Sequence, residues 1–260
     1  MKVKKTPIVV VGIVAVIAVI AVFAFMLGRG TSVDDHVASS PAVPSETTTN
    51  APEADVKVEQ TYETDIWGRQ VLINGVTGKV LGNLVPEDNR CEINPKISIQ
   101  KSYNAQTIWS ENNGPSAINS GVPVKYANTV TGAALAGWNY RILLFIGDEI
   151  TPEVAKHVNF NNQPDLAKKM GQKGLERSEI FTATLAPEAV RVLTCKEDFV
   201  VIEMAHKAFG DRNGKFESPQ WDIMRFSMTW NGDDWVYDVD SLKINSEIIH
   251  DLEGWTKWQY

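Results

Sequence analysis

An unbroken apolar run near the N-terminus constrains this chain more than any other feature of its sequence. The run from Pro7 to Leu27 is 21 residues long and contains no charged side chain. At about 1.5 Å of rise per residue, a helix of this length spans about 31 Å, close to the hydrocarbon thickness of a bilayer. Backbone groups inside lipid must satisfy one another, so the run has to be helical there. We therefore expect residues 7–28 to form a transmembrane anchor.

The charges on either side of the run indicate its orientation. Three lysines lie within residues 1–6, whereas Asp34 and Asp35 follow the run. Positive residues stay on the cytoplasmic side, so we expect a single-pass cell-membrane protein with a cytoplasmic tail at residues 1–6 and the remainder outside. The alternative is a cleavable signal peptide. Its apolar core is usually shorter and ends at a small-x-small site, and bulky residues occupy that place here.

A change in composition after the anchor predicts a linker. Residues 29–63 are rich in Ser, Thr, Pro, Ala and acidic residues, with few large side chains to bury. Such a segment cannot offset its ordering entropy, so we expect it to be disordered. A flexible coil of about 35 residues has ends on the order of 30 to 35 Å apart. The linker would hold residues 64–260, the expected extracytoplasmic domain, away from the membrane.

Charge and cysteine content limit the partners and the compartment. The net charge is −7 and the basic residues do not cluster beyond the N-terminus, which argues against nucleic acid as a partner. Cys91 and Cys195 both lie in the part expected outside, where a disulfide can form. The alternative is two buried thiols that never meet, because the sequence does not fix their distance.

The strongest helix signal in the domain is GAALAGWNYRILLFI at residues 132–146. It is apolar nearly all round, which predicts a helix buried in a core, and it is too short and too polar, at Asn139 and Arg141, for a second membrane span. Its small residues would let a sheet approach closely. Asn128, Thr129 or Thr131 could cap it. Thr151 followed by Pro152 predicts the start of a further helix, running to about residue 158, and residues 164–171 predict another.

The C-terminal half predicts strands. The apolar pattern repeats every second residue in 189–195, 198–208, 220–230 and 235–240, and Asn231-Gly232 is typical of a tight hairpin turn. Residues 96–103 and 107–109 predict two earlier strands. Helices followed by an antiparallel meander indicate an α+β domain.

No catalytic or metal-binding signature stands out. The four histidines, His36, His157, His206 and His250, lack ligand spacing, and no nucleotide-binding or nucleophile-elbow motif occurs. We therefore expect no catalytic residue, no metal, no cofactor and no enzyme activity. Glu203 is the one acid inside an apolar strand, and its burial would raise its pKa.

The C-terminal tail carries two candidate interaction residues, Trp255 and Trp258. The chain has eight Trp in total, and a surplus of such rings can mark a partner surface. The tail would either cover a sheet edge or dock a partner.

Several short motifs resemble a known group. Gly114-Pro115, then GVPVKYANT at residues 121–129, then Gly132-Ala133 and the Asn139-Tyr140 pair, resemble an actinobacterial family of membrane-anchored proteins with no assigned function. The Trp-rich segment WNGDDW at residues 230–235 also fits the family pattern, with one extra Asp. Lys125 and Gly137-Trp138 depart from the family pattern. The resemblance implies no catalytic residue.

The overall architecture is similar to a second group. A short tail, one span, a stalk and a helix-then-curved-sheet domain resemble the TcpC-type scaffold subunits of conjugation and type IV secretion machinery, whose domains have the nuclear transport factor 2-like fold. This likeness implies helices packed on a curved antiparallel sheet.

Two functions follow as expectations. The first is an outward-facing scaffold or assembly protein of a conjugative or type IV-like secretion apparatus. Its partners would be the bilayer (through residues 7–27), other envelope or secretion proteins and further copies of itself. The alternative is an extracytoplasmic module that binds a small ligand in the cone-shaped space such folds enclose. An enzyme on the same fold is a third hypothesis, which a buried, paired acid or histidine would favour.

Overall fold

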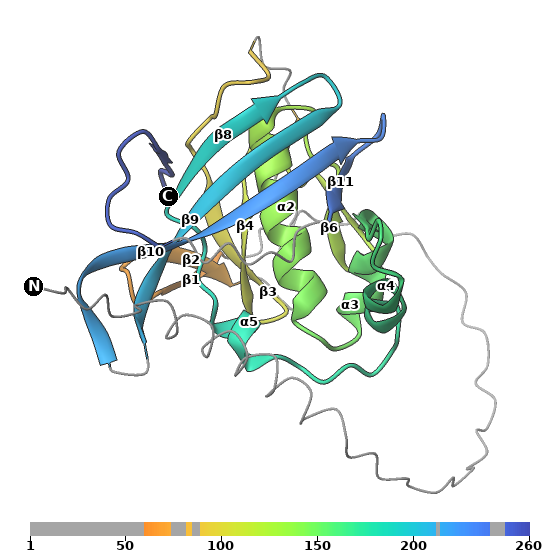
Figure 1. Cartoon of the computed structure of the whole chain (residues 1–260), viewed down its shortest axis with the longest axis horizontal. Helices are drawn as coiled ribbons and strands as arrows, with labels where there is room; N and C mark the ends of the chain where they lie inside the picture. The colour runs from red at the N-terminus through yellow and green to blue at the C-terminus, as the bar shows by residue number, and fades with distance from the viewer. Residues whose placement is uncertain (1–59, 74–81, 85–88, 212–213, 240–247) are drawn as a thin grey trace, which may run out of the picture. The chain divides into compact units, whose positions relative to one another are not determined.

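A computed structural model describes residues 60–73, 82–84, 89–211, 214–239 and 248–260 (Figure 1). The predicted anchor at residues 7–28 and most of the predicted linker at 29–63 lie outside the described residues. Within the described ranges, no helix is both long and apolar enough to cross a membrane. Helices are combined with mostly antiparallel sheets, so the predicted α+β class is confirmed.

The larger of the sheets is built from the C-terminal half. Its strands are ordered β13-β8-β9-β10-β11-β7, with β12 paired to β10. All neighbours are antiparallel except β7, which runs parallel to β11. The strands are β7 Val158–Asn159, β8 Ala189–Cys195, β9 Phe199–Asp211, β10 Gly214–Trp230, β11 Trp235–Asp238, β12 Ile248–Ile249 and β13 Thr256–Lys257. The four predicted strands correspond to β8 through β11, and β9 and β10 extend beyond the predicted bounds.

A smaller sheet comes from the first half of the described chain. It has the order β1-β2-β3-β4, with β2 and β3 parallel and the other pairs antiparallel. A separate hairpin, β5-β6, lies next along the chain. These strands are β1 Thr61–Thr64, β2 Gln70–Ile73, β3 Ser98–Ser102, β4 Ala105–Trp109, β5 Ala117–Asn119 and β6 Val122–Val124.

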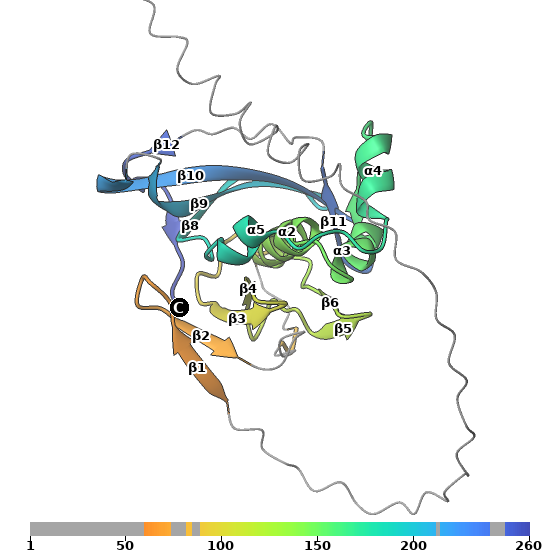
Figure 2. The same ribbon diagram turned by 90° about the horizontal axis from the view of Figure 1, so that it is seen from below.

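The long helix α2, Val130–Phe145, lies between the two sheets (Figure 2). It contacts β4 of the smaller sheet on one side and β10 and β11 of the larger sheet on the other. This arrangement explains why the helix is apolar nearly all round, because both of its sides are covered. We call the face of the larger sheet toward α2 its inner face, and the opposite one its outer face.

Two local features fix α2 in place. Thr129, one of the three predicted caps, accepts a hydrogen bond from the backbone N–H of Gly132 at 3.0 Å. Gly137 faces the sheet, where an added Cβ would come within 3.1 Å of the side chains of Phe226 and Met228. The predicted close approach of the small helix residues to a sheet is confirmed at this position.

The remaining helices are short. They are α3 Ile150–Val154, the 3-10 turn η1 Ala155–His157, α4 Pro164–Met170 and α5 Glu179–Ala183. The helix predicted to run to about residue 158 corresponds to α3 and η1, but Thr151 is not its N-cap. Thr151 lies inside α3 and is buried, and its hydroxyl donates to the carbonyl of Gly147 at 3.0 Å. The hydroxyl is used to join α3 to the chain after α2, so it is not available as a cap.

The hairpin between β10 and β11 differs from the predicted tight turn. Trp230 pairs with Trp235, so four residues form the loop. The side chain of Asn231 accepts hydrogen bonds from the N–H groups of Asp233 and Asp234, at 3.0 and 2.9 Å. The longer loop brings the side chain of Asp234 to the segment before α2, as described next.

Candidate functional site

The carboxylate of Asp234 joins the β10-β11 loop to the segment before α2. It accepts hydrogen bonds from the backbone N–H groups of Lys125 at 2.6 Å and Tyr126 at 3.1 Å, and from the Tyr140 hydroxyl at 3.4 Å. Lys125 also forms an ion pair with Asp233. Burial raises the pKa of Asp234, and the backbone N–H donors oppose that shift. Asp234 is thus a buried residue that connects parts of the chain distant in sequence.

Asn139 joins the same helix to the smaller sheet. Its carboxamide accepts from the N–H of Ile108 and donates to the Ile108 carbonyl, both at 2.8 Å, and it also donates to the Tyr126 hydroxyl at 2.9 Å. Trp235 completes the junction, because its indole N–H donates to the Ala127 carbonyl at 2.8 Å. Most of these residues belong to the motifs that carried the sequence resemblance, and their side chains hold the fold together.

His157 is the histidine closest to this junction. Its ring stacks on Tyr140 with centroids 5.6 Å apart, and it is half-buried. Burial lowers the pKa of His157, and the charge of Asp234 acts in the opposite direction. Of the described histidines, it is the one placed beside a buried acid and a tyrosine, as acid-base chemistry would require. Tyr140 and Asp234 are both buried and engaged, so the arrangement serves packing in this structure.

Glu203 lies on the outer face of the larger sheet between two arginines. In the cross-strand register, Arg191 of β8 and Arg225 of β10 flank it directly. Arg191 donates to one carboxylate oxygen at 2.6 and 2.8 Å, and Arg225 to the other at 2.5 and 2.9 Å. The glutamate side chain is only 2% exposed.

The expected rise in the pKa of Glu203 is wrong. Burial alone would raise this pKa, but the hydrogen bonds from Arg225 and Arg191 outweigh burial and hold it below its ordinary value. Glu203 is therefore a paired structural carboxylate. The sequence pattern revealed the acid in the strand but not the two arginines that the sheet register brings beside it.

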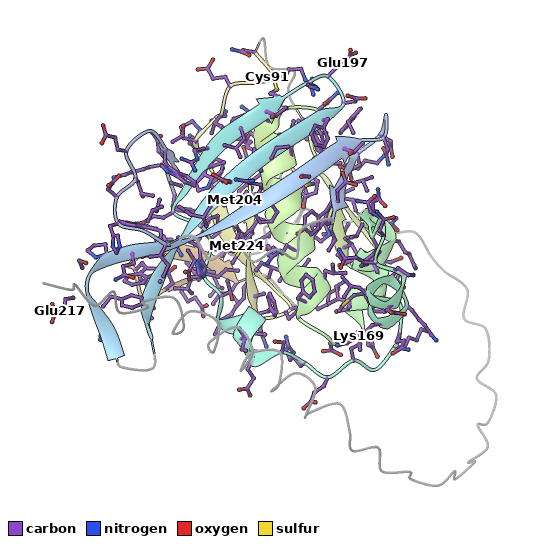
Figure 3. The ribbon with its side chains drawn as sticks, viewed as in Figure 1. Cys91, Lys169, Glu197, Met204, Glu217 and Met224 are labelled. Atoms are coloured by element: carbon purple, nitrogen blue, oxygen red, sulfur yellow. A yellow bond between two sulfur atoms is a disulfide. The ribbon has the colours of Figure 1, made fainter. Side chains whose placement is uncertain are left out.

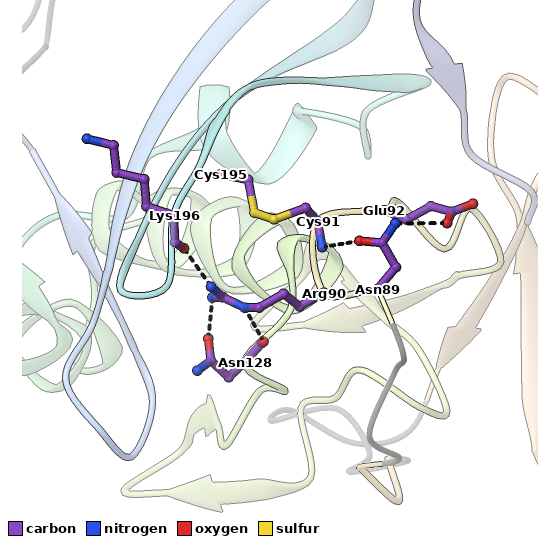
Figure 4. Close-up of a disulfide and its surroundings, with 7 residues drawn as sticks. All are labelled: Asn89, Arg90, Cys91, Glu92, Asn128, Cys195 and Lys196. Carbon is purple, nitrogen blue, oxygen red and sulfur yellow. Dashed lines mark hydrogen bonds between the residues drawn. A yellow bond between two sulfur atoms is a disulfide. The ribbon is translucent and has the colours of Figure 1, made fainter.

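Cys91 and Cys195 are joined by a disulfide, with their Cα atoms 5.8 Å apart (Figure 4). The bond connects the segment between β2 and β3 of the smaller sheet to the end of β8. Arg90 reinforces the same connection, because it donates to the carbonyl of Lys196 at 2.7 Å and to the side-chain oxygen of Asn128, also at 2.7 Å. One covalent bond and one arginine thus join three segments at this end of the molecule.

The two candidate interaction tryptophans have different positions. Trp258 lies in the main core and is 6% exposed, so its ring packs inside the protein. Trp255 is partly buried against a small outer-face cluster with Trp221 and Ile223, and the Arg191 guanidinium lies 4.5 Å from its ring centroid. Between them, β13 pairs with β8. The tail therefore covers the edge and outer face of the sheet, the first of the two roles considered for it.

Arg141 is a charged residue whose importance sequence reasoning missed. In the sequence it argues against a second membrane span, whereas in the structure it projects toward the inner face of the larger sheet and is 9% exposed. Its guanidinium donates to the Tyr237 hydroxyl at 3.1 Å. The sequence does contain a signal for it, because a cation in a largely apolar, buried helix is costly unless a polar group or a ligand compensates its charge. Among the described residues, no three His, Cys, Asp or Glu side chains gather as a metal site requires.

Comparison with known proteins gives one match. The family model described as a domain of unknown function (DUF8175) matches residues 85–257. Neither the curated proteins nor the solved structures provide a match.

Proposed function

The chain belongs to the family of the domain of unknown function DUF8175, and we propose that it is a membrane-anchored extracytoplasmic scaffold or assembly protein. One observation carries this proposal. The buried carboxylates are fully engaged within the fold, Asp234 by backbone N–H groups and Glu203 by two guanidinium groups. A catalytic acid must be free to reach a substrate, whereas a scaffold needs such groups to hold a rigid surface.

The proposed compartment rests on two further features. The apolar run at residues 7–27 has the length of a membrane span, and the positive charges before it favour an outward-facing domain. The Cys91–Cys195 disulfide suits an oxidising environment outside the cytoplasm. The predicted linker at 29–63 overlaps β1, which begins at Thr61, so a linker between the anchor and β1 would then give the domain its reach.

The proposed partners are other envelope proteins, those of a conjugative or type IV-like secretion apparatus, and further copies of the chain. This part of the proposal rests on the resemblance to TcpC-type scaffold subunits. Exposed apolar side chains offer places for such contacts. Ile66 in the β1-β2 turn and Ile180 in α5 are 66% and 64% exposed. Neither contributes to the core, so both are available to a partner.

Site-specific photo-crosslinking of the full-length protein in its native cells tests this function. A photoreactive residue at position 66 or 180 is expected to capture envelope or transfer-machinery subunits, identified by mass spectrometry. The same residue at Glu217, an exposed polar position of β10 where a bulky side chain fits without disturbing the core, is the matched control and should give no such product. Capture of nothing from either position 66 or position 180 would contradict the scaffold proposal.

The compartment has its own test. Free thiols in living cells are blocked with a membrane-permeant alkylating reagent, and the peptides carrying Cys91 and Cys195 are then analysed without reduction. We expect the disulfide-linked peptide pair. Recovery of both cysteines in alkylated form would argue against an oxidising compartment, while leaving the binding function open to the crosslinking experiment.

A further inference from the structure

Arg141 is a buried cation for which the described part of the chain provides no carboxylate partner. Its one hydrogen bond there goes to the neutral Tyr237 hydroxyl, and its Nε is buried with no partner. The rings of Phe145 and Phe226 lie beside the guanidinium, with centroids 5.8 and 6.0 Å away. Aromatic faces compensate a buried charge only in part, since its desolvation is expensive.

The inner face of the larger sheet is not fully buried along its whole length. On the inner face, Phe226 pairs with Ile202 across the strands, and both are fully buried. The next inner-face pair along β10 and β9 is Met224 and Met204, labelled in the middle of the sheet in Figure 3, and Met224 is only partly buried. Methionine is flexible and adapts to a guest, so this part of the face can admit an apolar group beside the guanidinium.

A second unpartnered group lies farther along the same face. His206 follows Met204 by two residues on β9, and its Nδ1 is buried without a hydrogen-bond partner among the described residues. The nearest carboxylate, that of Asp222, is 3.8 Å from this atom. Burial lowers the pKa of His206, Asp222 opposes this, and the charges of Arg69 and Arg141 lower the pKa further.

Of the acids nearby, Asp65 is already engaged, whereas Asp222 has His206 beside it at 3.8 Å. Asp65 forms a 2.8 Å ion pair with Arg69 and accepts its backbone N–H as well. Asp222 lies across the strand from His206. The inner face thus combines one guanidinium that has no carboxylate partner among the described residues with aromatic and thioether surface, which together match a ligand that is anionic at one end and apolar at the other.

We propose that Arg141 and Tyr237 bind the charged group of a small organic anion, a carboxylate or phosphate monoester with a flat apolar body, and that His206 lies farther along the same face. The anionic group would accept the free guanidinium donors, and the apolar body would lie against Phe145 and Met224. This site is independent of the scaffold function, because it uses the inner face and not the exposed residues 66 and 180.

Titration of the full-length protein in detergent with benzoate and with phenyl phosphate tests the site. Protein carrying ¹³C-labelled methionine methyl groups is expected to show a saturable shift of the Met224 signal, and calorimetry gives the affinity. Benzamide, which has the same ring without the charge, is the ligand control and should bind at least about tenfold more weakly. Binding of phenyl phosphate alone, or of benzoate alone, supports the site and identifies its anion class.

Substitutions separate this site from unspecific anion binding. Arg141→Gln is expected to weaken binding by about tenfold or more, because it removes a charged donor, whereas Arg141→Lys should retain part of the affinity. Arg177→Gln is the matched control, since Arg177 is an exposed arginine beside Asp148 and should bind as wild type. Unchanged chemical shifts of Met170, a core methionine in α4 outside the proposed site, in the ligand-free Arg141→Lys variant verify its fold.

Three results would overturn the proposal. They are no Met224 shift at millimolar benzoate and phenyl phosphate, equal affinities for benzoate and benzamide, and equal affinities of wild type and Arg141→Gln. The crosslinking result at positions 66 and 180 is not affected by any of them, so a failure of the anion site is distinguishable from a failure of the scaffold function.

Discussion

The two faces of the larger sheet differ in whether a buried charge has a partner of opposite charge. On the outer face, Glu203 is buried between Arg191 and Arg225, and both carboxylate oxygens are doubly hydrogen-bonded. On the inner face, Arg141 is buried against aromatic rings with one neutral acceptor. A buried charge therefore has no single interpretation. A saturated charge indicates structure, whereas an unsaturated one indicates either a cost in stability or a missing ligand.

The largest expected effect on stability comes from removing the Cys91–Cys195 disulfide. The double variant Cys91→Ser/Cys195→Ser removes a disulfide that spans 104 residues. The chain-entropy model predicts a loss of about 4 to 5 kcal/mol in the free energy of unfolding. Urea denaturation followed by tryptophan fluorescence measures this loss. A change below about 1 kcal/mol would show that Arg90 and its hydrogen bonds hold this end of the molecule without the disulfide.

Glu203→Gln tests the saturated side of the comparison. The substitution keeps the shape but leaves two guanidinium groups facing a neutral amide, and breaking a buried pair of this kind costs about 3 to 5 kcal/mol. We expect the lower end, about 3 kcal/mol, because both arginines are partly exposed to water. Urea denaturation at neutral pH measures the difference. Glu217→Gln, at an exposed position of β10, is the control and should be neutral.

A third prediction compares Glu203 with Asp234, since the pKa values of these two buried carboxyl groups shift in opposite directions. The pKa of Glu203 is lowered from 4.5, so its contribution to stability is present above that pH and is lost as pH falls through the folded-state value. The pKa of Asp234 is raised from 3.8, so its protonation stabilises the folded state as pH falls through the raised value.

The corresponding experiment is a pH series of urea denaturation on wild type, Glu203→Gln and Asp234→Asn. Asp234→Asn should lose about 2 kcal/mol at neutral pH, because an amide cannot accept from all of the N–H donors that the carboxylate serves. Wild type gains stability as Asp234 takes up its proton, and the variant does not, so the difference in their free energies of unfolding should grow on acidification. A difference that shrinks would contradict the raised pKa of Asp234. The difference between wild type and Glu203→Gln should shrink on acidification in any case.

The smallest effect is expected on the unsaturated side. Arg141→Met replaces the buried cation by an apolar side chain of similar length and removes one hydrogen bond to Tyr237. We expect the ligand-free protein to keep its stability or gain up to about 1 kcal/mol. A loss as large as that of Glu203→Gln would mean that Arg141 is as well compensated as the outer-face charges, and the contrast between the faces would disappear.

Sequence periodicity predicted the strands of the larger sheet and the central helix well. Their signals are local, because residues 189–195 alternate by themselves and the apolar character of α2 needs no partner to be recognised. The hairpin at Asn231 was predicted too short, since its loop length depends on Asp234 reaching Tyr126, more than a hundred positions away in the chain. Local propensity cannot anticipate such a contact.

The site was predicted less well for the same reason. Glu203 was identified as unusual, but its pKa depends on strand register, which places Arg191 and Arg225 beside it. The pairing of Cys91 with Cys195 depends on distance in space, which the sequence left open. Trp258 illustrates a third limit, because composition counts a tryptophan without indicating whether it faces the core or the solvent.

The position of α2 between two sheets has a consequence during synthesis. The smaller sheet and α2 are complete once Phe145 has emerged, whereas β8 through β11, which cover the other side of the helix, are made afterwards. Until they arrive, the side of α2 that contains Gly137 has no cover, and exposed apolar surface of this kind promotes aggregation. A nascent chain stalled after residue 145 would therefore be a natural client for a chaperone, and the last strands of the protein would be what releases it.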